Sequence, residues 1–233
     1  MNERPETDTD TATPLAARFI TFEGGEGVGK STQIKRLMAR LNRAGVQVVR
    51  TREPGGTPKA EAVRAFILQG KGQEWGPGAE AVLFAAARLD HVDSLIGPSL
   101  DAGKWVLSDR FADSTRAYQG LTGGVPNVLI DALEVLALHG RKPDLTFVMD
   151  MDPKEAFDRV ARKAEEEGVP VIQDRFEREA LDWHRKLRDN YLEIARNNPE
   201  RCVVVDAAGS EDEIENAVWA AVEERFPELK ANA

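Results

Sequence analysis

One short stretch limits the fold of this chain more than any other: GGEGVGKS, residues 24–31. It matches the pattern G-x-x-x-x-G-K-[ST], and it lies between an apolar run and a segment with helical periodicity. Glycines allow the chain to turn so that successive backbone N–H groups face one point, where the start of the helix adds a positive partial charge. A glycine-rich turn without a ligand is the alternative, but the flanking strand and helix favour a phosphate-binding loop.

Five strand-like apolar runs alternate with segments of helical periodicity or turn chemistry. The runs are RFITF (18–22), VQVVR (46–50), KWVLS (104–108), DLTFVMD (144–150) and RCVVVD (201–206). This alternation predicts an α/β protein whose five-stranded parallel sheet has helices on both faces. Combined with the phosphate loop, it predicts the P-loop NTPase fold.

The helix after the loop has the clearest pattern, since apolar residues recur at i, i+3, i+4 and i+7 and Gly45 follows in the place of a helix C′ residue. The apolar residues are Ile34, Leu37, Met38 and Leu41. A second helix is predicted over 79–96, with Pro98 beyond its end.

The charged stretch over about 160–176 lies between two segments with helical patterns, 152–161 and 180–195. Its charge density and the Gly168-Val-Pro170 break predict a mobile lid. At the other end of the chain, residues 1–16 contain four acidic residues and one basic residue, which predicts a disordered acidic tail. Residues 17–233 are then expected to form a single domain.

The composition narrows the class of protein. A net charge of −9 argues against a general nucleic-acid binder, because affinity for a phosphate backbone needs a basic surface. A locally basic cleft for a small phosphate ligand stays possible on an acidic protein. No apolar stretch approaches the length that crosses a bilayer, so no membrane role is expected. The single cysteine excludes an internal disulfide framework, which favours the cytoplasm.

If the loop binds a nucleoside triphosphate, Lys30 reaches the β- and γ-phosphates and the Ser31 hydroxyl ligates Mg²⁺. The residues predicted to contact ATP are Gly24, Gly25, Glu26, Gly27, Val28, Gly29, Lys30, Ser31 and Thr32. The loop alone does not define a reaction, since GTPases, motor ATPases and small-molecule kinases share it.

Two further stretches suggest what is bound opposite the nucleotide. TREPGGTP, residues 51–58, places Arg52 at the carboxyl edge of the sheet, where ligands bind in open α/β folds, although a simple tight turn explains it equally. Phe84 and Arg88 lie four residues apart and share a helix face. They could stack on a nucleobase and donate to its carbonyl oxygen, or they could belong to the core.

The run WVLSDR, residues 105–110, brings an acid and a base to the same edge of the sheet. Asp109 could hold Mg²⁺ or its waters, and Arg110 could bind a phosphate through two hydrogen bonds. A structural ion pair is the alternative interpretation.

Taken in order and at their spacings, these motifs resemble thymidylate kinases (dTMP kinases) of the bacterial kind. The stretches are FEGGEGVGKST, TREPGGTP, LFAAARLDHV, SDRFADSTRAYQG, KPDLTFVMDMDP and DRFE…YLEI. The resemblance covers about residues 19–206. It implies a P-loop kinase domain over 17–233 that transfers the γ-phosphoryl group of ATP to dTMP with Mg²⁺, a step in dTTP synthesis.

The resemblance also implies roles in acceptor binding. Arg52 and Arg110 would hold the dTMP phosphate, Phe84 would stack on thymine, and Arg88 would donate to its O4. The segment that lines the base corresponds to Ser114, Thr115 and Gln119. Tyr118 matches the aromatic residue that crowds the C2′ position of the sugar.

The carboxylate of Glu26 is unexpected in a phosphate loop. The resemblance implies that it accepts a hydrogen bond from the 3′-OH of dTMP, and a solvated side chain is the alternative. Transfer to an anionic phosphate oxygen needs no general base, so cations and positioning carry the reaction. The catalytic residues are predicted to be Lys30, Asp109, Arg110 and, from the lid, Arg162.

Arg159 is the second candidate in the lid, and Arg175 could instead be an ion-pair residue at its base. The resemblance further implies a homodimer.

Two rival functions remain. A deoxynucleoside kinase would use Glu53 as a general base. A P-loop switch protein would hydrolyse nucleotide without an acceptor, although the D-x-x-G and N-K-x-D motifs of GTPases are absent from the sequence.

Overall fold

The computed structural model describes residues 15–171 and 174–229, so residues 1–14 of the tail predicted over 1–16 lie outside them. Five parallel strands form one sheet in the order β2-β3-β1-β4-β5. The strands are β1 (Phe19–Gly24), β2 (Val48–Arg52), β3 (Trp105–Asp109), β4 (Leu145–Asp150) and β5 (Cys202–Asp206). The predicted α/β fold and its five strands are therefore confirmed, although β2 begins two residues later than predicted.

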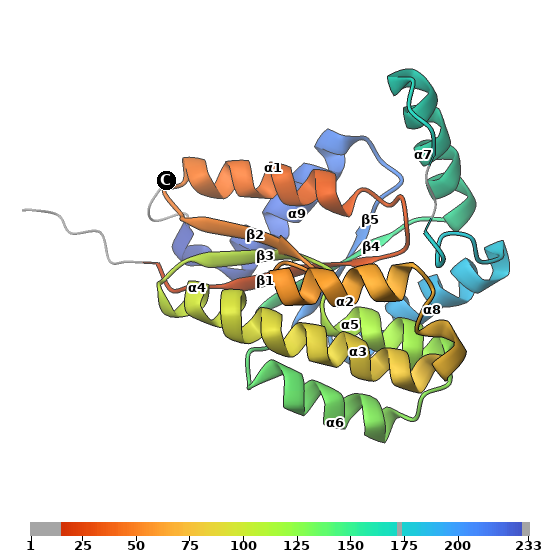
Figure 1. Cartoon of the computed structure of the whole chain (residues 1–233). Coiled ribbons are helices and arrows are strands. Elements are labelled where there is room, and N and C mark those ends of the chain that lie inside the picture. The colour runs from red at the N-terminus through yellow and green to blue at the C-terminus, as the bar shows by residue number, and fades with distance from the viewer. Residues whose placement is uncertain (1–14, 172–173, 230–233) are drawn as a thin grey trace, which may run out of the picture.

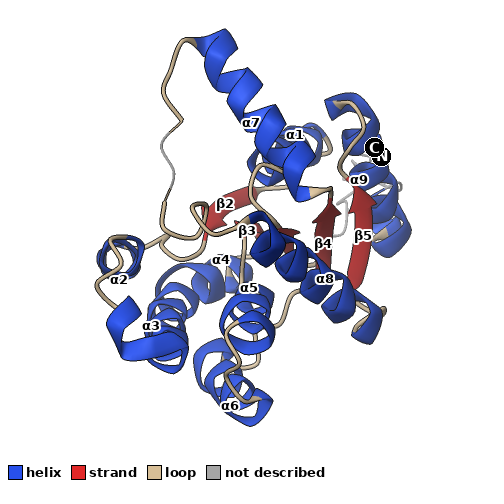
Figure 2. Cartoon of the chain, turned by 90° about the vertical axis from the view of Figure 1, so that its right-hand side faces the viewer, coloured by secondary structure: helices blue, strands red, loops and turns tan. Residues whose placement is uncertain are grey.

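Helices cover both faces of the sheet (Figure 1). One face carries α1 (Lys30–Arg43) and α9 (Glu211–Arg225), and the other carries most of the remaining helices. Those are α2 (Pro58–Leu68), α3 (Gly76–His91), α4 (Gly97–Asp101), α5 (Ala112–Thr115), α6 (Asn127–Leu138) and α8 (Leu181–Asn197). A further helix, α7 (Pro153–Glu167), extends away from the sheet and projects from the body of the molecule in two views (Figures 1 and 2).

Alternation along the strands divides the core into two layers. Phe147 and Met149 of β4 pack with the α1 side chains, whereas Val148 between them packs against α8 on the opposite face. The predicted α1 pattern is confirmed, because Ile34, Leu37 and Leu41 are buried and Met38 packs beside them. Gly45 has φ +79° directly after the C-cap of that helix, as predicted. Both sheet faces are covered, so the strands are mostly apolar.

The prediction for the second helix was wrong at both ends. The helix α3 begins at Gly76, and the helical path continues through a π-helical stretch, Val92–Ile96, into α4. Pro98 therefore lies inside a helical segment. It lies in the first turn of α4, directly after the π-helical stretch, where the irregular hydrogen bonding accommodates a residue without an N–H.

The boundaries of the tail and the lid also differ from the prediction. Leu15 packs against the core and the Ala16 carbonyl accepts a hydrogen bond from the Trp105 indole at 2.9 Å, so the fold begins before residue 17. The helix α7 extends to Glu167, where Gly168 ends it with φ +67°. The first half of the predicted lid is thus helical, because its charged side chains tolerate a solvated helix as well as a loop.

Candidate active site

The phosphate loop connects β1 to α1 at the carboxyl edge of the sheet. Gly24 has φ +127°, and a Cβ there would lie 2.5 Å from the Met149 carbonyl oxygen. Gly27 has φ +73°, and a Cβ there would lie 2.7 Å from the Ala156 carbonyl oxygen of α7. Only glycine permits both the left-handed backbone and these close approaches. The loop is therefore packed between β4 and the lid helix.

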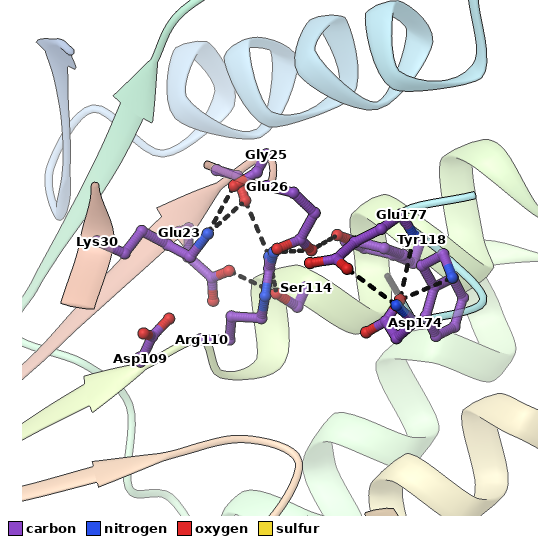
Figure 3. Close-up of polar contacts among 12 residues, drawn as sticks. Glu23, Gly25, Glu26, Lys30, Asp109, Arg110, Ser114, Tyr118, Asp174 and Glu177 are labelled. Atoms are coloured by element: carbon purple, nitrogen blue, oxygen red, sulfur yellow. Dashed lines mark hydrogen bonds and ion pairs between the residues drawn. The ribbon is translucent and has the colours of Figure 1, made fainter. Parts of the chain in front are cut away.

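Lys30 projects from the first turn of α1 back across the loop (Figure 3). Its Nζ donates to the Gly25 carbonyl at 2.6 Å and to the Gly24 carbonyl at 3.2 Å. Burial and the charge of Arg110 lower the pKa of the Lys30 amine, while nearby carboxylates oppose this shift. The ammonium is held by carbonyls of the loop itself, and phosphate oxygens could replace them as acceptors.

Ser31 and Asp109 lie together, as required of the predicted Mg²⁺ ligands. The Ser31 hydroxyl donates to an Asp109 carboxylate oxygen at 2.6 Å. Within the described parts of the chain, no group of three or more His, Cys, Asp or Glu side chains could hold a metal ion. Mg²⁺ in kinases uses one or two protein ligands and completes its shell with water and phosphate oxygens. The Ser31–Asp109 pair therefore fits this ion.

A groove of about 650 Å³ runs along the loop and α7. Basic side chains line it although the chain as a whole is acidic. They are Lys30, Arg52, Arg64, Arg110, Arg159 and Lys163. Such a groove would attract a polyphosphate, because local cationic charge raises the concentration of an anionic ligand regardless of net charge.

Glu26 lies at the centre of a hydrogen-bond cluster (Figure 3). Its Oε1 accepts from Arg110 Nη2 at 2.5 Å and from the Tyr118 hydroxyl at 2.9 Å. Burial alone would raise the pKa of the Glu26 carboxyl, but Arg110, Lys30 and the Tyr118 hydroxyl outweigh it and lower the pKa to about 2. Glu26 is therefore an anion at neutral pH, fixed by partners rather than solvated.

Arg110 makes the most contacts in this cluster. Its Nη1 donates to the Gly24 carbonyl at 2.9 Å, to the Tyr191 hydroxyl at 2.9 Å and, less closely, to Ser114. Its backbone has φ +70°, a conformation that residues with a Cβ rarely adopt. Burial opposes the charge, but Glu26 outweighs it and keeps the pKa of the guanidinium well above its ordinary value.

A second cavity, of about 160 Å³, adjoins the groove. The predicted base-binding residues line it together: Phe84, Arg88, Ser114, Thr115, Tyr118 and Gln119. Glu26, Glu53, Arg64 and Arg110 line both the cavity and the groove. The two spaces thus meet at these four side chains, an arrangement that suits a transfer between two bound molecules.

Arg88 is 3% exposed and is held by three acceptors. Its Nε donates to Glu53 at 2.7 Å, and its Nη2 donates to the Phe111 carbonyl and to Thr115 Oγ1 at 3.1 and 3.0 Å. Among the described residues no hydrogen bond is seen from Nη1, which leaves this nitrogen for a ligand. The guanidinium is therefore oriented before any ligand enters.

Glu53, the general base of the rival interpretation, is buried in an ion pair. One oxygen accepts from Arg88 and the other lies 2.9 Å from His91 Nδ1. His91 is itself fully buried, with Nε2 2.7 Å from the Thr51 hydroxyl, so it does not reach the cavity. A carboxylate engaged in this way positions Arg88 and is not available to take a proton from a substrate hydroxyl.

Two predicted cationic residues lie farther out. Arg52 is exposed at the rim of the groove, where Nη2 donates to Glu61 at 3.1 Å. Arg162 is exposed on α7 and does not line the groove, whereas Arg159 and Lys163, four residues apart on the same helix face, do. Arg159 donates to the Ala208 carbonyl at 3.3 Å. The prediction for Arg162 requires α7 to move.

Sequence patterns missed several residues of the site. Arg64 of α2 lines both spaces, but nothing in the sequence distinguishes it from other helical arginines. Arg175 forms an ion pair with the buried Glu80 of α3 at 2.5 Å, so the ion-pair interpretation of Arg175 is correct. Beside it Phe176 packs edge-on against Tyr118 and lines the cavity. The base of the lid therefore forms one wall of the smaller cavity.

Comparisons with known proteins agree with this geometry. The sequence model of the thymidylate kinase family matches residues 22–218. Thymidylate kinase of Rhodopseudomonas palustris (strain BisB18) is 49% identical over 227 residues, covering 97% of each chain. That of Bradyrhizobium diazoefficiens is 50% identical over 209 residues, covering 90% of each chain. A crystal structure of thymidylate kinase from Ehrlichia chaffeensis superposes with a TM-score of 0.71 at 34% identity, covering 89% of this chain and 99% of that one.

Proposed function

Because this chain belongs to the thymidylate kinase family, we propose that its groove binds ATP, its smaller cavity binds dTMP, and the γ-phosphoryl group passes between them where they meet. The products are ADP and dTDP. The observation that carries the assignment is the junction, where Glu26, Glu53, Arg64 and Arg110 line both spaces.

The chemistry needs charge neutralisation and alignment. The attacking oxygen of dTMP is already anionic at neutral pH, so the barrier comes from bringing two polyanions together. Lys30 would hold the β- and γ-phosphates from the loop side. Arg110 would bridge to the acceptor phosphate, with Arg52 and Arg64 at the rim. Fixed cations in a partly desolvated groove stabilise transferring charge without reorganising during the reaction.

Ser31 and Asp109 would hold Mg²⁺, which would supply positive charge to offset that of the phosphates. The remaining loop residues, Gly24 to Thr32, would contribute backbone N–H groups at the N-terminus of α1. From the lid, Arg159 already lies against the groove. Arg162 would join it only if α7 closes.

Base selection would depend on Phe84 and Arg88. Phe84 would stack on the ring, and Nη1 of Arg88 would donate to O4 of thymine. Cytosine presents an amino donor in that position, so two donors would face each other in a buried cavity, which is unfavourable. Thr115 and Gln119 line the same cavity, and the Arg175–Glu80 pair supports Gln119 through a long contact of 3.5 Å between Gln119 and Glu80.

Sugar selection would depend on Glu26 and Tyr118, which share a hydrogen bond at 2.9 Å. The Glu26 carboxylate faces the cavity from the loop and would accept a hydrogen bond from the 3′-OH. The Tyr118 ring, packed edge-on by Phe176 and Trp183, is held rigidly where a 2′-hydroxyl would come close. Glu26→Gln should therefore reduce the preference for 3′-hydroxylated acceptors over 3′-deoxy ones.

The assignment is tested by incubating the full chain with Mg-ATP and either dTMP or thymidine and measuring ADP. We expect turnover with dTMP and little with thymidine, since Glu53 is not free to act as a base. Preferential turnover of thymidine would instead establish a deoxynucleoside kinase. Hydrolysis of ATP that no monophosphate stimulates would favour a switch protein.

We also propose a homodimer that forms through α6. Val128, Val135 and Leu136 lie at i, i+7 and i+8 and are 76%, 79% and 57% exposed. Apolar side chains gathered on one helix face are typical of subunit interfaces. Sedimentation at micromolar concentration should give a dimer, and Val135→Lys should give a monomer. A monomeric parent protein would refute this interface.

We also propose a cytoplasmic location, because Cys202 is a free thiol and a reducing compartment keeps cysteines unpaired. Across residues 15–171 and 174–229, none of the helices has the length and apolar character needed to cross a membrane. Fractionation of cells that express the chain would test the location.

A further inference from the structure

Glu23, in β1, is a fully buried carboxylate to which the sequence patterns assign no role. Its two oxygens are both engaged, and Figure 3 shows the contact with Ser114. Oε1 accepts from the Phe111 backbone N–H at 2.7 Å, and Oε2 accepts from the Ser114 hydroxyl at 2.6 Å. Both donors belong to the segment that follows β3 and contains Arg110.

This segment has an unusual backbone. Arg110 adopts φ +70°, and a residue with a Cβ stays in that region only when its surroundings hold it there. The Arg110 N–H donates to the Phe22 carbonyl at 2.9 Å, and the Ser108 hydroxyl donates to the Arg110 carbonyl at 2.8 Å. The Glu23 bond to the Phe111 N–H adds the next contact along the chain. Two residues of β1 thus hold the turn: Phe22 accepts from the N–H of Arg110, and Glu23 accepts from the N–H of the next residue.

The second oxygen of Glu23 sets the direction of a chain of hydroxyls. In its ionised form, which predominates at pH 8, the Glu23 carboxylate can only accept. The Ser114 hydroxyl then donates a hydrogen bond to it, and the Ser114 oxygen stays free to accept. Tyr191 lies 2.8 Å from Ser114 and can donate to it, which leaves the Tyr191 oxygen to accept from Arg110 Nη1 at 2.9 Å. Every hydroxyl in the chain therefore presents lone pairs toward the guanidinium.

The burial of Glu23 has an energetic consequence. Burial first, and then the charge of Asp113, raise the pKa of the Glu23 carboxyl to about 7. Its direct donors are a neutral amide and a neutral hydroxyl, so the ionised form is unfavourable at this position. A neutral side chain of the same shape would stabilise the fold better at alkaline pH.

We infer that Glu23 is a positioning residue for phosphoryl transfer, which holds the turn after β3 and orients Ser114 and Tyr191 so that Arg110 points to the junction of the two ligand spaces. The inference rests on the proposed function, because it assigns Glu23 a role in that reaction. It predicts that charge at this position matters to turnover more than to folding.

The test compares Glu23→Gln with the parent protein at pH 8. Glutamine keeps the size and can still accept from the Phe111 N–H, but its amide can donate to Ser114 and reverse the hydroxyl chain. We expect kcat with dTMP to fall on the order of 10- to 100-fold, as for a misplaced catalytic group. The KM for ATP should change less than about twofold, because the donor side of the loop is untouched. The melting temperature should be unchanged or higher.

A matched control comes from the same strand. Thr21→Val removes a buried hydroxyl that lies 2.8 Å from Thr146 Oγ1 but touches no part of the Arg110 segment, so kcat should be retained. Tyr191→Phe removes the hydroxyl that links Ser114 to Arg110. In the Tyr191→Phe background, Glu23→Gln should therefore lower kcat by a smaller factor than it does in the parent protein.

The outcomes separate the two proposals. If the parent protein does not phosphorylate dTMP, the proposed function fails. If the parent is active and Glu23→Gln keeps kcat within about twofold, the positioning role is refuted. A large fall in the melting temperature of Glu23→Gln would indicate a structural residue and would also refute the positioning role. The same holds if the Thr21→Val control loses as much kcat as Glu23→Gln does.

Discussion

Replacing Arg88 tests the base-binding assignment most directly, but it has two effects. Arg88→Met removes the donor proposed for thymine O4 and also leaves the Glu53 carboxylate buried without its cation. Breaking a buried ion pair from one side destabilises a protein by about 3–5 kcal/mol. We expect the lower value, because His91 still faces the other oxygen at 2.9 Å.

For a chain of 233 residues, a loss of about 3 kcal/mol lowers the melting temperature by roughly 6–12 °C. The same substitution removes a charged hydrogen bond to the substrate, which corresponds to about 1.5–3 kcal/mol, or on the order of 10- to 100-fold in kcat/KM for dTMP. The discrimination between dTMP and dCMP should fall with it, whereas the KM for ATP should change little.

A double variant separates folding from binding. Glu53→Gln removes the stranded charge but keeps an acceptor for His91, so Glu53→Gln with Arg88→Met should recover most of the lost melting temperature. Turnover of dTMP should stay low in the double variant. Glu53→Gln alone is the reference for the double variant. It leaves the buried Arg88 guanidinium without its anion, so its melting temperature should also fall, but Arg88 retains Phe111 and Thr115 as acceptors and stays available to the base.

The measurements are thermal unfolding and a coupled ADP assay with dTMP and dCMP. If the double variant turned over dTMP within about twofold of the Glu53→Gln control, Arg88 would act only through stability and the base-binding assignment would be refuted.

Three further predictions concern Gly24 and Glu23 of β1 and Asp109 of β3. Gly24→Ala should destabilise the fold by about 1–3 kcal/mol and weaken ATP binding, measured by thermal unfolding and calorimetry, because its Cβ would lie 2.5 Å from Met149 O. Asp109→Asn should raise the Mg²⁺ concentration needed for half-maximal turnover while leaving the melting temperature within a few degrees. The pKa of Glu23 is raised from 4.5 to about 7, so the folded state binds more protons and the free energy of unfolding should fall as pH rises between these values. The fall in the free energy of unfolding should reach about 3 kcal/mol and should be absent in Glu23→Gln. If denaturant titrations gave the parent protein and Glu23→Gln the same pH profile, the prediction would be wrong.

The sequence predicted those parts of the protein that depend on short-range interactions. The glycines of the loop, the α1 periodicity and the five apolar runs each reflect local turn chemistry or burial period, so the sheet and its phosphate loop could be predicted. The ends of parallel strands meet at one edge, which is why Lys30, Asp109 and Arg110 were expected together before their distances were known.

The tertiary structure decided the partners of these side chains. Nothing local indicates that Glu26 binds Arg110, 84 positions away, or that Glu53 holds Arg88 from a different element. The same holds for Glu23, since its role depends on an amide and a hydroxyl 88 and 91 residues along the chain. Backbone turns and burial periods are encoded locally, whereas hydrogen-bond partners are chosen by which side chains the packed sheet brings within about 3 Å of one another.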